Sequence, residues 1–217
     1  MPCRSLWQTD WAEHSLDGSW NIVCPGPSLE RTAKLVDASR PTIAVNAAIR
    51  APVPIMAWCS WDAPTDTVHG QSWRARGVGG SMVDCRTVIT QGPLERRWYD
   101  WLVRVTGNRE PWVVGQRRQD PMPPEWRRGG VDAGPSWLLA VRSAVLRGGA
   151  TTVRCYGLDL AGEGYAFGAP DPRNRDAPDW AGRWVGEKVM LERTARVLET
   201  LDVKLIRVTG DVPPLEP

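Results

Sequence analysis

The chain has 217 residues, a formal net charge of +2 and an apolar fraction of 42%. This length is enough for one sizeable core, and this composition excludes wholesale disorder and a polycationic protein. No apolar run is long enough for a membrane span or has the N-terminal position of a signal peptide. We therefore expect one cytoplasmic domain over 1–217 that contacts no membrane.

The five cysteines and two histidines form no metal-ligand spacing and no C-x-x-C pair. Cys24, Cys59 and Cys155 each lie in an apolar run. We expect buried free thiols rather than disulfides or a zinc site, and we expect no resident metal.

The first part of the chain alternates apolar runs with turn residues. Residues 1–18 are polar and are expected to form an extension on the surface. Ser28 is a residue type that caps helices, and it precedes a predicted helix that reaches about Asp37. Strands are predicted at 20–24, 42–46 and 55–60.

The second part keeps this alternation around two polar segments. Residues 116–133 are expected to form a loop, and residues 161–183, rich in Gly, Pro and Asp, a long lid loop. Helices are predicted at 93–105, 136–146 and 184–201, and strands within 81–90 and at 111–115, 151–160 and 203–208. Strands that alternate with helices predict a Rossmann-like three-layer α/β sandwich with a mostly parallel sheet.

In such sheets, ligands bind beyond the carboxyl ends of the strands. This rule selects Asn46 and the segments 26–28, 60–62, 134–136 and 157–159 as candidate site residues. Gly26-Pro27-Ser28 opens a helix, whose backbone N–H groups and partial positive charge suit a phosphate. The same tripeptide also suits an ordinary strand-to-helix turn, and the residues alone leave both interpretations open.

Asp62 and Asp159 each follow a predicted strand. Two carboxylates at one rim suit an acid–base pair or a Mg²⁺ site. An aspartate at a strand end is also a common turn or capping residue. Both interpretations stay open.

Arginine and tryptophan are interleaved over residues 94–128. Arg97, Trp101 and Arg104 share one face of the predicted helix there. Such a face could grip a nucleic-acid backbone and stack its bases. The alternative is an exposed arginine face above buried tryptophans.

Several of these segments together resemble a known group of proteins. The motif C-P-G-P-S-L at 24–29 is similar to G-x-G-P-S-L, and Gly157-Leu158-Asp159-Leu160 is similar to G-x-D-L. Both motifs occur in the bacterial lipooligosaccharide sialyltransferases and in the archaeal 6-hydroxymethylpterin diphosphokinases with the motility accessory factors. The resemblance covers most of residues 20–208, with 64–132 poorly matched.

The resemblance implies a nucleotide-binding site and a transferase activity. It assigns catalysis to Asp159, Asp62 and Tyr165. It assigns the nucleotide to Gly26, Pro27, Ser28, Asn46, Gly134, Ser136 and Gly157. For a glycosyltransferase we also expect an arginine of the 173–183 loop, Arg173, Arg175 or Arg183, to contact the departing phosphate or the acceptor. The interleaved stretch adds Arg97, Trp101 and Arg104 as acceptor contacts.

The sequence departs from the sialyltransferase pattern at the general base. Where those enzymes carry a histidine before the last helix, this chain reads G-R-W-V-G-E-K, without one. We then expect a base among Asp159, Asp62 and Asp171.

Our first hypothesis is a glycosyltransferase that uses a nucleotide-sugar donor and an acceptor hydroxyl, with a hydroxymethylated DNA base as one candidate acceptor. The alternatives are a Mg²⁺-dependent diphosphokinase of the 6-hydroxymethylpterin type and a non-catalytic nucleotide or nucleic-acid binder. The sequence does not indicate an oligomeric state.

Overall fold

The computed structural model describes residues 11, 15, 17–61, 64, 87–106, 112–116, 123–131, 134–161, 166 and 180–208. In these residues, seven strands form one sheet in the order β5-β4-β3-β2-β1-β6-β7, and every neighbouring pair is parallel. The strands are β1 (Ser19–Val23), β2 (Thr42–Val45), β3 (Ala57–Cys59), β4 (Thr87–Gln91), β5 (Trp112–Gln116), β6 (Thr152–Tyr156) and β7 (Lys204–Val208). The predicted parallel α/β sandwich is confirmed.

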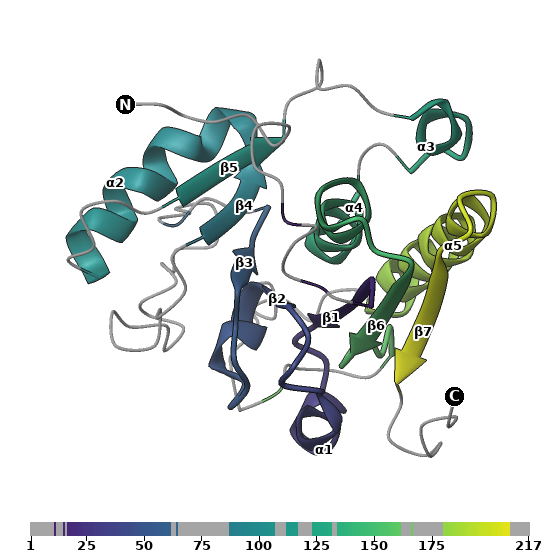
Figure 1. The fold of residues 1–217 in the computed structure, drawn as a ribbon, viewed down its shortest axis with the longest axis horizontal. Helices are drawn as coiled ribbons and strands as arrows, with labels where there is room; N and C mark the ends of the chain where they lie inside the picture. Colours follow the sequence, from purple (N-terminus) through teal and green to yellow (C-terminus); the bar gives the residue numbers. More distant parts are fainter. Residues whose placement is uncertain are drawn as a thin grey trace.

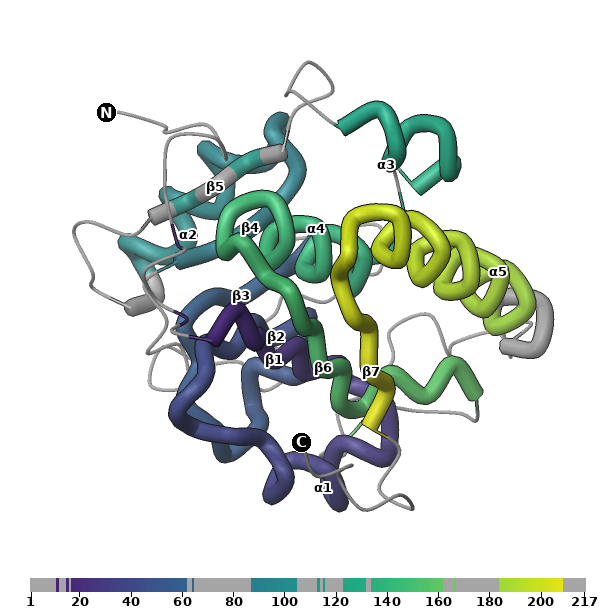
Figure 2. Tube along the Cα trace, turned by 45° about the vertical axis from the view of Figure 1, so that its right-hand side comes forward, coloured from purple at the N-terminus to yellow at the C-terminus, as the bar shows by residue number. Residues whose placement is uncertain are grey.

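Helices cover both faces of the sheet (Figure 1). One face carries α3 (Pro124–Arg128), α4 (Ser136–Gly148) and α5 (Trp180–Glu199). The other face carries α1 (Leu29–Thr32), the 3₁₀ turn Asn46–Arg50 and α2 (Glu95–Thr106). In Figure 2, α4 and α5 again lie beside each other, and α1 lies across the sheet from them.

Alternating residues of the strands supply the two apolar layers. In β1, Trp20 and Ile22 face α4 and α5, while Val23 packs on the opposite layer. Trp58 of β3 packs with Trp98 and Trp101 of α2, with ring centroids 4.8 and 6.1 Å away. A strand buried on both faces needs apolar residues at nearly every position, which is why the predicted strands read as short continuous apolar runs.

The structure corrects the prediction at four places. The helix after Ser28 is short, because α1 ends at Thr32 and a 3₁₀ turn takes the chain only to Leu35. The segment predicted as a loop at 116–133 contains the helix α3, and α5 begins at Trp180 rather than at 184. Trp11, expected on the surface, is 4% exposed and stacks on Trp20.

Other predictions lie outside the described residues. These are the conformation of 81–86 and most of the expected lid loop at 161–183. In the part of the chain that the structure describes, no helix combines the length and apolarity that crossing a membrane requires.

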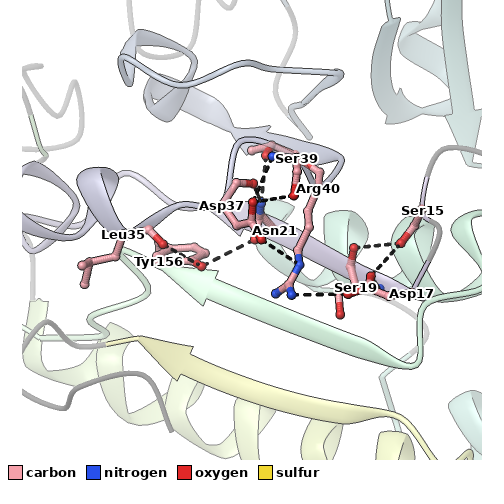
Figure 3. Close-up of polar contacts among 10 residues, drawn as sticks. Ser15, Asp17, Ser19, Asn21, Leu35, Asp37, Ser39, Arg40 and Tyr156 are labelled. Carbon is pink, nitrogen blue, oxygen red and sulfur yellow. Dashed lines mark hydrogen bonds and ion pairs between the residues drawn. The ribbon is translucent and has the colours of Figure 1, made fainter. Parts of the chain in front are cut away.

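A buried polar network ties the loop before β2 to β1 (Figure 3). Asn21 of β1 is fully buried, and its Nδ2 donates to the Asp37 carbonyl at 2.9 Å and to the Thr42 hydroxyl at 3.2 Å. The Tyr156 hydroxyl lies 3.5 Å from Asn21 Oδ1. These contacts pair both ends of the Asn21 amide, which compensates for its burial inside the sheet.

Candidate functional site

The strand order places a topological switch point between β1 and β6. From β1 the chain builds β2 to β5 on one side, and then crosses to build β6 and β7 on the other. The connections that leave the carboxyl ends of β1 and β6 therefore diverge, and ligands of open α/β sheets bind in the crevice this creates. Val23 and Tyr156 are the paired last residues of these two strands.

A pocket of about 180 Å³ opens at this point. Of the residues proposed from the sequence, Gly26, Pro27, Asn46, Ser136, Gly157 and Asp159 line it. The other lining residues are Cys24, Pro25, Val45, Trp61, Pro135, Trp137, Leu158, Leu160, Ala161, Trp184 and Glu187. The pocket wall thus contains Asn46 and parts of the segments 26–28, 134–136 and 157–159. From the segment 60–62 it contains Trp61.

Two glycines allow the segments after β1 and β6 to touch. Gly157 has φ +65°, and a Cβ there would lie 2.2 Å from the Cys24 carbonyl oxygen. A Cβ on Gly26 would lie 2.4 Å from the Gly157 carbonyl oxygen and 2.7 Å from Asp159 Oδ2. Only glycine fits such an approach, so both glycines have a structural reason that is independent of any ligand.

Asp159 occupies the start of the helix that Ser28 precedes. Its Oδ2 accepts from the Ser28 backbone N–H at 2.7 Å, and its Oδ1 accepts from the Ser28 hydroxyl. Ser28 has helical dihedral angles and makes no side-chain capping bond, which corrects the predicted capping role. The Asp159 carboxylate therefore accepts the backbone N–H at the N-terminus of α1, and the Ser28 side chain makes no capping hydrogen bond there.

The remaining backbone donors of this turn are also engaged. The N–H groups of Cys24, Gly26 and Leu29 donate to the carbonyls of Tyr156, Gly157 and Gly26. Pro25 and Pro27 have no N–H. In this conformation a phosphate could not use the turn as a backbone cradle without displacing Asp159. Gly26 and Pro27 line the pocket, whereas Ser28 does not.

Asn46 differs from the residues of the turn. It has φ +49°, a left-handed conformation that Asn tolerates better than most side chains. Its carbonyl accepts from the Trp58 indole at 2.9 Å. Its buried Oδ1 has no hydrogen-bond partner among the described residues. An unpartnered buried acceptor at the wall of a pocket marks a position where a ligand can donate.

Ser136 orients the neighbouring tryptophan. Its Oγ accepts from the Trp61 N–H at 3.0 Å, and Gln91 Nε2 donates to the Trp61 carbonyl at 2.8 Å. The Cys59 thiol lies 3.2 Å from the Ser136 carbonyl, to which it donates. Trp61 lies two residues after the end of β3, and these contacts hold its backbone at the pocket.

Helix α5 contributes Trp184 and Glu187 to the pocket, and neither residue lies at the end of a strand. The two residues are three apart and therefore share a helix face. Glu187 Oε2 accepts from the Trp137 indole N–H of α4 at 3.1 Å. The spacing of Trp184 and Glu187 on one helix face can be seen in the sequence. The hydrogen bond between Glu187 and Trp137, 50 positions earlier, cannot.

The pocket thiol is not a nucleophile. Burial raises the pKa of Cys24 well above its ordinary value, and neighbouring groups, Cys155 first and Glu187 next, add to this. Burial also raises the pKa of Cys155 to about 12. These thiols stay protonated near neutral pH, and Cys24, Cys59 and Cys155 are free cysteines, as expected.

The described lining is aromatic and acidic. Trp61, Trp137 and Trp184 supply indole rings, and Asp159 and Glu187 supply carboxylates. No arginine or lysine is among the described residues that line the pocket. No cluster of three or more potential metal-ligating side chains occurs in the described ranges.

The other proposed residues lie elsewhere or outside the described residues. Gly134 does not line the pocket, and a Cβ there would lie 2.7 Å from the side chain of Leu138. Arg97 and Arg104 are exposed on α2, whereas Trp101 is buried against Trp58 and Trp98 and offers no free ring face for stacking. The positions of Asp62, Tyr165, Asp171, Arg173 and Arg175, and the side chain of Arg183, fall outside the described residues.

No protein-family model, curated protein or solved structure matches this chain. The resemblance to the sialyltransferases and diphosphokinases therefore rests on the sequence segments alone. The structure adds that both motifs meet at one switch point.

Proposed function

We propose that this chain is a glycosyltransferase that holds the nucleoside part of a nucleotide-sugar donor in the switch-point pocket. The observation that carries this proposal is the convergence of Asn46, Ser136, Gly157 and Asp159 with three tryptophans at the carboxyl ends of β1 and β6. Rossmann-like sheets bind nucleotides at this place.

The size and the lining of the pocket support a nucleoside. A volume of about 180 Å³ is below the ~300–1,000 Å³ of sites that enclose a drug-sized ligand. It suits a base and part of a ribose rather than a whole nucleotide sugar. The partly exposed indole rings of Trp61 and Trp184 offer stacking surface for a base, and the unpartnered Asn46 Oδ1 offers an acceptor for one of its N–H groups.

The charge of the lining indicates where the diphosphate lies. Asp159 and Glu187 would repel a phosphate, so the donor would direct its phosphates out of the described pocket. Arg173, Arg175, Arg183 and Tyr165, which follow β6 in the sequence, are the proposed contacts for the departing phosphate. They would stabilise the negative charge that develops on the leaving group.

The acceptor is an alcohol in this proposal. Its hydroxyl oxygen bonds to the anomeric carbon and loses its proton to solvent. The bond from that carbon to the phosphate oxygen breaks, and its electron pair leaves with the nucleotide. The exposed Arg97 and Arg104 of α2 suit a polyanionic acceptor, and DNA with a hydroxymethylated base is our candidate.

The diphosphokinase alternative fits the described residues less well. It requires a Mg²⁺ ion held by carboxylates, and Asp159 is the one proposed ligand that the structure describes. Both its oxygens already accept from Ser28. A Mg²⁺ ion on Asp159 would therefore have to share these oxygens with the hydrogen bonds from Ser28.

A ligand panel tests the proposal. Thermal unfolding is followed with UDP-sugars, GDP-sugars, CMP-linked sugars and ATP, each with and without Mg²⁺. We expect one nucleotide sugar to stabilise the protein, by about 2.7 kcal/mol at 100 times its Kd. Stabilisation by ATP with Mg²⁺ alone would instead favour the diphosphokinase, and no response to any nucleotide would contradict both.

A matched pair of variants locates the binding site. Trp184→Ala removes an indole from the pocket and should abolish the stabilisation. Val185→Ala, at a neighbouring position that is 64% exposed, should leave it unchanged. Equal effects of the two variants would place the nucleotide elsewhere.

A further inference from the structure

We propose that the pocket selects a nucleotide whose base is uracil. Its wall presents hydrogen-bond donors that suit a carbonyl oxygen, and beside them an acceptor that suits a ring N–H. The donors are the backbone N–H groups of Ser136 and Trp137, and the acceptor is Asn46 Oδ1. This inference rests on the proposed function, since it names the base of the nucleotide sugar that the pocket would hold.

The first argument is the N-terminus of α4, which lies at the pocket. Pro135, Ser136 and Trp137 all line the pocket, and Pro135 makes no side-chain capping hydrogen bond. Among the described residues, no group accepts from the backbone N–H of Ser136 or of Trp137. The pocket wall therefore has two adjacent backbone donors and the partial positive charge of a 13-residue helix.

The start of α1, at the same pocket, shows the contrasting case. There the Asp159 carboxylate accepts from the Ser28 backbone N–H at 2.7 Å. A side chain of the protein thus occupies the start of α1, whereas the described residues place no acceptor at the start of α4. A ligand atom with lone pairs can take that place.

The second argument is the acceptor beside the start of α4. Val45 and Cys59 are the paired last residues of β2 and β3, and the Cys59 thiol donates to the Ser136 carbonyl at 3.2 Å. Helix α4 therefore begins over the end of β2, which Asn46 follows. Asn46 lines the same pocket, and its buried Oδ1 has no partner among the described residues.

Only some bases match this combination of donors and acceptor. Two N–H groups that converge on one atom need two lone pairs, which a carbonyl oxygen has and a ring nitrogen lacks. Asn46 Oδ1 then needs an N–H next to that carbonyl. Uracil and guanine carry a carbonyl directly beside a ring N–H, whereas the amino groups of cytosine and adenine lie beside a ring nitrogen without hydrogen. The combination therefore favours uracil and guanine.

The volume of the pocket decides between these two bases. About 180 Å³ suits the single ring of uracil with part of its ribose better than the double ring of guanine. Uracil O4 lies across the ring from the ribose, so a uracil that reaches α4 with O4 leaves its diphosphate at the mouth of the pocket. This agrees with the outward direction of the phosphates that Asp159 and Glu187 require.

The test measures the affinity of the full chain for UDP, CDP, GDP and ADP by calorimetry. We expect UDP to bind about 100-fold more tightly than CDP, because cytosine leaves the donors of α4 and the Asn46 acceptor poorly matched. A methyl group at N3 of uridine removes the ring N–H. 3-Methyluridine should therefore bind at least about tenfold more weakly than uridine.

Two variants of Ser136 isolate the backbone donor. Ser136→Pro removes the N–H at the first helical position, where proline is tolerated, and Pro135 already has the extended ψ of 164° that a following proline favours. Ser136→Ala keeps this N–H, and both variants lose the hydroxyl that accepts from the Trp61 N–H. The preference for UDP over CDP should fall about tenfold in Ser136→Pro and stay unchanged in Ser136→Ala.

Asn46→Gly gives an independent check, because it removes the acceptor and leaves α4 intact. The preference for UDP over CDP should again fall about tenfold. A preference that is unchanged in both Ser136→Pro and Asn46→Gly would overturn the assignment, as would an equal loss in Ser136→Ala and Ser136→Pro.

The nucleotide panel separates this inference from the proposed function. If CDP, GDP or ADP binds as tightly as UDP, the uracil assignment is wrong while a nucleotide site in this pocket stands. If the wild-type protein binds none of the four nucleotides, the assignment falls together with the proposed function.

Discussion

Two asparagines in this chain, Asn21 and Asn46, have opposite surroundings. Asn21 lies in β1, and its amide nitrogen donates to the Asp37 carbonyl and the Thr42 hydroxyl. Asn46 follows β2, and its buried Oδ1 has no partner among the described residues. Satisfied buried polar groups hold a fold together, whereas unsatisfied ones commonly await a ligand or water. The comparison separates the polar network that supports the sheet from the pocket at its edge.

The largest expected effect comes from disrupting the pocket wall itself. Gly157→Ala should destabilise the protein by about 2–4 kcal/mol, because Ala is strained at φ +65° and its Cβ would overlap the Cys24 carbonyl. Urea unfolding measures the change. The control is Gly186→Ala in α5, where nothing lies within 4 Å of the new Cβ. It should stabilise by up to about 1 kcal/mol, and the same sign of effect in both variants would contradict the structure.

Breaking the satisfied network should have the next largest effect. Asn21→Ala leaves its buried partners without their hydrogen bonds and should lower the free energy of unfolding by about 2 kcal/mol. The increase in melting temperature produced by a bound nucleotide should stay the same as in wild type. An unchanged unfolding free energy would show that the network does not support the sheet.

Replacing Asn46 should have the opposite result, with little change in stability and a loss of nucleotide affinity. Asn46→Gly keeps a residue that tolerates φ +49° and removes the unpartnered oxygen, so the unfolding free energy should change by less than about 0.5 kcal/mol. Nucleotide affinity, measured by calorimetry, should fall about tenfold with the loss of one hydrogen bond. Undiminished affinity would remove Asn46 from the site.

The smallest expected effect concerns acid stability at the edge of the network. Hydrogen bonds from the Ser39 side chain and backbone lower the pKa of Asp37 below its ordinary value of 3.8. A lowered pKa gives stability that is fully present above the ordinary value and is lost as pH falls through the folded-state pKa. Asp37→Asn should therefore reduce the loss of melting temperature below about pH 4. Identical acid profiles of the two proteins would contradict this.

The contrast between these asparagines was not apparent from the residues alone. Asn21 was read as one position of an apolar strand, and Asn46 was selected because it ends a strand. Hydrogen-bond satisfaction depends on partners such as Thr42 of the neighbouring strand and Tyr156 of β6, which pair with β1 only in the folded sheet. A strand-end rule therefore predicted residues of the pocket wall, but not which of their polar atoms lack a hydrogen-bond partner.

Local pattern was sufficient for the sheet and for much of the pocket. Short apolar runs bounded by Gly, Pro and polar residues predicted the parallel α/β architecture, because strands covered on both faces must be apolar throughout. The parallel arrangement also predicted that Asn46, Ser136 and Asp159 would meet, since the carboxyl ends of parallel strands share one edge. The short α1 and the helix α3 were missed because packing, rather than local propensity, determines the length of such elements.

The contacts that the side chains of the candidate site make could be known only from the folded chain. Ser28 was expected to cap a helix and cradle a phosphate, but Asp159, 131 positions later, takes both of its donors. Trp101 was expected to offer a stacking face, but packing against Trp58 and Trp98 buries it. Glu187 of α5 is joined to α4 because the Trp137 indole N–H donates to its carboxylate. Side-chain roles depend on long-range contacts, and a linear pattern carries no record of which distant residue will fill a given space.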